Sequence, residues 1–90
     1  MVKPYTEEKI SETRYIRKFS PDLFDEELKW HWDEEERIIK STFETNWMFQ
    51  LDNNLPVKIE GEIRIPKGEW HRLIKGDGIL ELEITKIKDI

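Results

Sequence analysis

Short runs of alternating apolar and polar residues, separated by turn-forming residues, constrain this fold most. The clearest run has Leu80, Leu82 and Ile84 alternating with Glu81 and Glu83. A period of two is the period of a β-strand with one buried face. Turn-forming residues stand between such runs, at residues 52–56, 66–68 and 75–78. About seven short strands with frequent turns predict an all-β domain, either a sandwich or a small barrel.

The expected strands cover residues 13–19, 28–33, 37–43, 47–51, 57–59, 63–65, 70–74 and 80–84. Helices should be few or absent. The polar residues 1–12 predict a flexible arm or a short helix before a single domain over residues 13–90. The acidic run Glu34 to Glu36 indicates an exposed turn. An alternative for residues 25–43 is one amphipathic helix, because Leu28, Trp32, Ile39 and Phe43 could share a helical stripe.

Composition limits the function classes. A chain of 90 residues is enough for one domain with a modest core. The net charge of −5, with scattered Lys and Arg, argues against nucleic acid as the main partner. There is no cysteine, which excludes disulfides and thiolate metal sites. No apolar run approaches a membrane span or a signal core, so we expect a cytoplasmic protein that does not bind membranes.

A Pro-x-Gly turn followed by a histidine marks a candidate site. The residues are Pro66, Gly68 and His71, and the chain has one other histidine, His31. Alternation would point His31 and Asp33 to the same face of a strand. If His71 faces them, two histidines and one carboxylate suit Fe(II), Mn(II), Zn(II) or Ni(II), with positions open for water or substrate.

Gly61, Ile63, Ile65, Pro66, Gly68 and His71 resemble the second sequence motif of the cupins, with one residue fewer than usual between Gly61 and Pro66. The family's first motif is His-x-His followed by glutamate. Here His31 matches its first position, Asp33 takes the second, and Arg37 stands near the glutamate position. Lys75 replaces the asparagine that follows the second-motif histidine. The likeness covers residues 27–86, and the chain also resembles very short cupin-like proteins of bacteria and tailed phages.

The resemblance implies a small double-stranded β-helix barrel whose pocket holds a divalent metal, a small polar ligand, or both. Arg37 would repel a cation but favour a carboxylate or phosphate ligand. Met48 and Gln50 share a face of the strand at 47–51, so we expect them to line the same pocket as Arg37. The order His-x-Asp…His also resembles 2-oxoglutarate-dependent dioxygenases, but few basic residues follow His71 to hold the co-substrate. Whether the protein is an enzyme stays open at this point.

The alternative function is a non-catalytic, homodimeric binding or accessory protein that has lost the cupin metal site. In that case His71 would be a strand histidine bonded to a neighbouring carbonyl. If the site residues face the barrel lumen, Trp30, Trp32 and Trp70 must face outward. Outward tryptophans need a cover, either the N-terminal segment or a second subunit, so we expect a homodimer. Trp47, Phe49 and Leu51 are expected in the core or at an interface.

Overall fold

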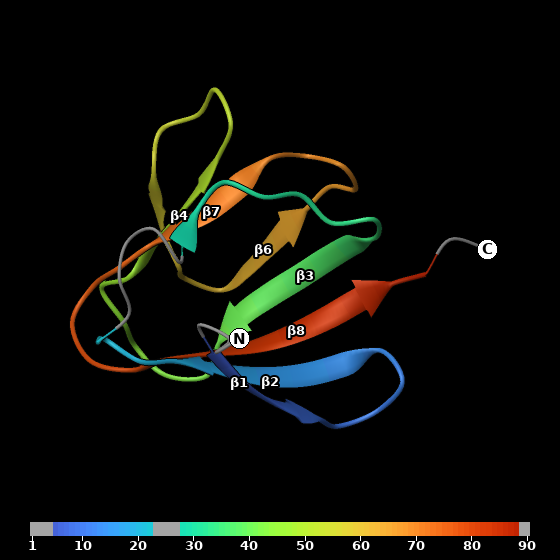
Figure 1. The fold of residues 1–90 in the computed structure, drawn as a ribbon, viewed down its shortest axis with the longest axis horizontal. Helices are drawn as coiled ribbons and strands as arrows, with labels where there is room; N and C mark the ends of the chain where they lie inside the picture. Colours follow the sequence, from blue (N-terminus) through green and yellow to red (C-terminus); the bar gives the residue numbers. More distant parts are fainter. Residues whose placement is uncertain (1–4, 23–27, 89–90) are drawn as a thin grey trace.

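Two antiparallel sheets make up the protein in the computed structural model, which describes residues 5–22 and 28–88 (Figure 1). The strands are β1 (Tyr5–Lys9), β2 (Arg14–Phe19), β3 (Glu36–Ser41), β4 (Met48–Leu51), β5 (Val57–Lys58), β6 (Glu62–Ile65), β7 (His71–Ile74) and β8 (Leu80–Ile87). The larger sheet has the order β1-β2-β8-β3-β6, and the smaller one has the order β5-β4-β7. The described residues contain no α-helix, as the alternation predicts.

The core is formed where the inward residues of both sheets meet. Along β8, Leu80, Leu82 and Ile84 are buried, and Glu81 and Glu83 are not. The register pairs Leu80 with Phe19 and Ile84 with Ile39, which puts these apolar side chains on one face of the large sheet. From the small-sheet side come Trp47 and Phe49, both almost fully buried. Trp47 also donates from Nε1 to the carbonyl oxygen of Gly78, at 3.0 Å, so its polar atom is satisfied in the core.

The expected strands are confirmed at seven of the eight places, with small shifts of their ends. The exception is residues 28–33, where only His31 forms a bridge, an isolated antiparallel pair with His71. The helix alternative is wrong for residues 28–43, and its first residues, 25–27, lie outside the described part of the chain.

Two further expectations need correction. Residues 1–12 were expected as a loose arm or short helix, but Tyr5–Lys9 form the edge strand β1, which pairs with β2 from Tyr5↔Phe19 to Lys9↔Tyr15. The run Glu34 to Glu36 is not a purely solvated turn. Glu36 begins β3 and binds the Arg64 guanidinium at 2.6 and 2.9 Å.

The Pro66–Gly68 turn joins β6 to β7 and fixes the start of β7. Gly68 has a φ of 76°, in the left-handed region that favours glycine. Its N–H donates to the carbonyl oxygen of Asp33 at 3.0 Å, and the N–H of Glu69 donates to that of Pro66 at 3.3 Å. The turn therefore anchors the backbone of Asp33 at Gly68, which stands three residues before His71.

Candidate metal centre and its cavity

His31 and His71 lie side by side because their backbones pair directly. Each N–H donates to the other's carbonyl oxygen, at 3.0 Å and 2.8 Å. Directly opposed residues of an antiparallel pair point to the same face, so both imidazoles enter the space between the sheets. Their ring centroids are 4.3 Å apart in an edge-on arrangement. His71 is 4% exposed and packs against the ring of Phe49, whereas His31 is exposed at the cavity mouth.

Both histidines use Nδ1 in the same way. Nδ1 of His31 lies 2.9 Å from the carbonyl oxygen of Lys29, and Nδ1 of His71 lies 2.9 Å from that of Glu69. A carbonyl oxygen can only accept, so each Nδ1 carries the proton. In the neutral form this leaves a lone pair on each Nε2, directed away from the backbone. Metal-ligating histidines are held by such bonds to carbonyl oxygens.

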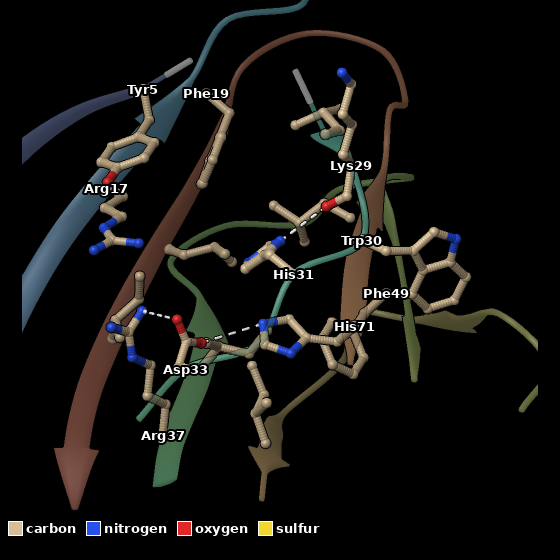
Figure 2. A pocket seen from close by; sticks show the side chains of 16 residues that line it. Tyr5, Arg17, Phe19, Lys29, Trp30, His31, Asp33, Arg37, Phe49 and His71 are labelled. Atoms are coloured by element: carbon tan, nitrogen blue, oxygen red, sulfur yellow. Dashed lines mark hydrogen bonds and ion pairs between the residues drawn. The ribbon is translucent and has the colours of Figure 1, made fainter. Parts of the chain in front are cut away.

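Asp33 completes a three-residue cluster with the two histidines (Figure 2). One potential ligand atom from each residue lies within 4.8 Å of the others. Asp33 Oδ2 is 3.3 Å from His71 Nε2, yet it is buried without a hydrogen-bond partner in the structure. Burial raises the pKa of the Asp33 carboxyl, but the His71 contact and the positive charges of Arg37, His71 and His31 outweigh it. The pKa of Asp33 therefore lies below its ordinary value.

Arg37 approaches the other oxygen of Asp33. Its Nη1 lies 3.4 Å from Asp33 Oδ1, while its Nε and Nη2 donate to Glu35 Oε1 at 2.9 and 2.7 Å. Lys86 lies 3.8 Å from the same Glu35 oxygen. Glu35 thus neutralises much of the Arg37 charge, and Arg37 orients the carboxylate so that Oδ2 faces the histidines.

A cavity of about 450 Å³ opens in front of this cluster. His31, Asp33, His71 and Arg37 line it, together with core side chains such as Phe49. A volume of this size suits a small organic molecule. The structure thus places the three expected metal ligands and Arg37 around one space.

Met48 and Gln50 do not line this cavity, contrary to the expectation. Phe49 is the inward residue of β4, so its two neighbours point to the opposite face. There, Gln50 accepts a hydrogen bond from Arg72 Nε at 2.9 Å.

The sequence interpretation missed Arg17, Lys29 and Tyr5, which also line the cavity. Arg17 alternates with Phe19 on β2, so it shares the inward face of that strand. A charged residue on the apolar face of a strand was the available signal. Tyr5 was hidden because residues 1–12 were not expected to form a strand.

The tryptophans divide as expected between core and surface. Trp47 is buried, whereas Trp30, Trp32 and Trp70 are 37%, 49% and 47% exposed, so the described N-terminal strands do not cover them. The guanidinium of Arg72 lies 4.8 Å from the Trp30 ring centroid, a cation–π contact on this outer face.

Neither the family models nor the curated proteins contain a match to this sequence. Solved structures do match. The DMSP lyase DddQ from Ruegeria pomeroyi DSS-3 superposes with a TM-score of 0.71 at 17% identity, over 89% of this chain and 41% of the lyase. An RmlC-like cupin with a double-stranded β-helix fold from Methanocaldococcus jannaschii gives 0.63 at 14% identity, over 94% and 81% of the two chains. Fe(II) HppE gives 0.61 at 11% identity, over 82% and 41%.

The protein therefore has the double-stranded β-helix fold of the cupins, as the Pro66–His71 motif predicts. The chain spans about two fifths of the DMSP lyase length. At these identities the likeness concerns the fold, and the chemistry must be argued from the residues of this chain. No helix in the described part of the chain is both long and apolar enough to cross a membrane.

Proposed function

We propose that this cupin-fold protein binds a divalent transition metal through His31, Asp33 and His71, and a small polar ligand in the adjoining cavity. Nε2 of each histidine and one carboxylate oxygen of Asp33 are the ligand atoms. Two imidazoles and a carboxylate suit Fe(II), Mn(II), Zn(II) or Ni(II). One of the structural neighbours, HppE, is an Fe(II) protein of this fold.

The buried oxygen of Asp33 is the observation that carries this proposal. Oδ2 has no hydrogen-bond donor, and the polar atom 3.3 Å from it, His71 Nε2, holds a lone pair when the imidazole is neutral. Two lone-pair atoms facing each other at 3.3 Å in a half-buried site are unfavourable. Either a proton on Nε2 or a cation shared by the two residues removes the conflict. A metal ion would also engage His31 Nε2, which a proton on His71 would not.

The cluster fits a metal with a small adjustment. Ligand atoms around a tetrahedral ion are about 3.4 Å apart, since metal–ligand distances are about 2.1 Å. The observed span of up to 4.8 Å is wider than that. His31 is the exposed member, so its side chain can move without disturbing the core.

The roles of the other residues follow from their contacts. When bound, a divalent metal would act as a Lewis acid toward a ligand oxygen. Arg37 holds Asp33 Oδ1 and so directs Oδ2 toward the histidines. The backbone carbonyls of Lys29 and Glu69 fix the protonated nitrogen of each imidazole. Phe49 covers the buried face of His71 and excludes water there.

Metal titration of the chelator-treated protein tests the proposal. Isothermal titration calorimetry with Zn²⁺, Mn²⁺ and Ni²⁺, and with Fe²⁺ under anaerobic conditions, should give one site per chain for at least one metal. H71A should lose that site, while D52N, which removes a carboxylate outside the cluster, should keep it. Absence of stoichiometric binding by every metal, or equal binding by H71A, would reject the metal site.

The exposed tryptophans favour a second candidate, a homodimeric binding or accessory protein without metal. Trp30, Trp32 and Trp70 leave large apolar side chains on the surface, and burial between two copies would cover them. Arg37 beside Asp33 also suits a metal-free state, since it supplies a cation already. Sedimentation equilibrium at micromolar concentration separates the oligomeric states. A dimer together with no metal uptake would favour this candidate over the first.

A further inference from the structure

Arg17 is an arginine on the apolar inner wall of the barrel, beyond the metal cluster. Its directly opposed neighbour on β8 is the buried Leu82, and Phe19, two residues along β2, is also buried. The Arg17 side chain is only 16% exposed and lines the cavity. Burying an arginine in such a place costs side-chain entropy and desolvation energy, so its guanidinium needs polar partners to compensate.

The edge strand β1 holds the Arg17 guanidinium in place. Glu7 is directly opposed to Arg17, and its Oε1 accepts a hydrogen bond from Arg17 Nε. The Tyr5 ring lies 4.3 Å below the guanidinium carbon. Within the described part of the chain, hydrogen bonds use only this Nε, so both Nη groups remain available as donors. A guanidinium that is held through Nε, with both Nη groups available, can bind a carboxylate or phosphate group through two N–H donors.

The charges around the cavity point the same way. Two guanidinium groups, those of Arg17 and Arg37, and a single carboxylate, that of Asp33, line the cavity, whereas the ammonium group of Lys29 points away from it (Figure 2). A divalent metal on the cluster would add further positive charge. Figure 2 shows Arg17 and Arg37 on one side of the cavity and His31 and His71 on the other.

Building on the proposed function, we propose that the ligand is a small organic anion whose carboxylate or phosphate group is bound by the Nη groups of Arg17. Its apolar body packs against the core side chains that form the remaining walls, including Phe19, Leu82 and Phe49. Arg37 is not the anion-binding residue, because Glu35 and Asp33 already engage its three nitrogens.

Hexanoate, hexyl phosphate and neutral hexanamide are the probes, titrated by calorimetry into chelator-treated and metal-loaded protein. One or both anions should bind at least about tenfold tighter than hexanamide, since a charge-assisted pair outweighs a neutral one. The better anion identifies the head group. R17Q should lose about tenfold in affinity for that anion in both metal states. R14Q is the matched control, because Arg14 lies on the same strand, is exposed and pairs with Glu83; its affinity should not change.

Equal binding of hexanamide and the anions, no binding of either anion, or equal affinities of R17Q and R14Q would overturn the inference. Anion binding that needs the metal but survives R17Q would also overturn it, since the metal alone would then hold the anion. If R17Q fails to fold, the same titration is made with R17K. Lysine keeps the positive charge but lacks the paired N–H groups of the guanidinium, so its affinity for the anion should fall several-fold. Unchanged affinity would count against Arg17 as the anion-binding residue. Loss of the metal site by itself leaves the Arg17 effect measurable in chelator-treated protein.

Discussion

Replacement of Asp33 by asparagine tests how the cluster is held together without metal. Asparagine keeps the shape of the side chain but removes its charge. At pH 8 imidazoles are ordinarily neutral, so wild-type Asp33 Oδ2 faces a lone pair on His71 Nε2 at 3.3 Å. In D33N the amide NH₂ can donate to that lone pair. One added hydrogen bond is worth about 1 kcal/mol, and one weakened contact to Arg37 at 3.4 Å offsets it.

We therefore expect the free energy of unfolding of chelator-treated D33N at pH 8 to stay within about 1 kcal/mol of wild type. The same small difference is expected at pH 5.5, because the lowered pKa of Asp33 leaves its carboxylate ionised at both pH values.

At lower pH the wild type should lose stability relative to D33N. Because the pKa of Asp33 in the folded state is lowered, its carboxylate contributes stability above the unfolded-state pKa. That contribution is lost as pH falls through the folded-state pKa, below about 3.9. The stability of wild type relative to D33N should thus be about constant between pH 8 and pH 5.5 and fall toward pH 3.

Urea unfolding followed by tryptophan fluorescence, at pH 8, 5.5 and 3, measures this profile. E34Q is a control, since Glu34 takes no part in the cluster. A loss of about 3 kcal/mol or more at pH 8 would refute the reasoning, because it would mean that the carboxylate has a strong partner when the imidazoles are neutral.

Three further outcomes are expected. Zn²⁺ at about 100 times its Kd should raise the unfolding free energy of wild type by about 2.7 kcal/mol and leave H71A unchanged, measured by thermal shift; equal shifts would contradict the metal site. G76A should lower the free energy of unfolding in urea by about 1–3 kcal/mol, because an added Cβ would lie 2.7 Å from the Trp47 backbone nitrogen. An unchanged free energy of unfolding would show that the backbone at residue 76 can shift to make room for the methyl group. W47F should lower the free energy of unfolding by about 1–3 kcal/mol, because it leaves a cavity and removes the hydrogen bond to the Gly78 carbonyl oxygen. An unchanged urea midpoint would mean that neighbouring core side chains repack into the cavity.

Much of the sheet structure was predictable, because one face of most strands is buried. Along β8 the alternation of leucine and glutamate specifies both the strand and its inner face. The strand β1 had no such signal. Tyr5 to Lys9 carry a single large apolar residue, since an edge strand with an open side needs little apolar surface. Its pairing depends on β2, which a local pattern does not show.

The sequence predicted which residues lie together at the candidate site, but it did not predict the full lining of the cavity. Alternation correctly separated His31 and Asp33, which turn to the cavity, from the exposed Trp30 and Trp32. The same rule tells which residues share a face but not which face is inside. Met48 and Gln50 were placed in the pocket on this ground, although the apolar Phe49 between them marks the inner face.

The segment at residues 28–33 shows why a regular strand was not required there. Its described backbone bonds to the rest of the fold are the two exchanged between His31 and His71 and the one from Gly68 to Asp33. These three bonds fix just the two residues whose side chains enter the cluster. The Pro66–Gly68 turn supplies one of these bonds and leads into His71. The motif therefore does more than contribute one histidine, because the same turn sets the position of Asp33.

Without a cation the cluster gains little stability from this close approach, since the Asp33 oxygen finds no donor. A metal ion would join the loosely tied segment to β7 and stabilise both, so binding and local order at this site should be coupled.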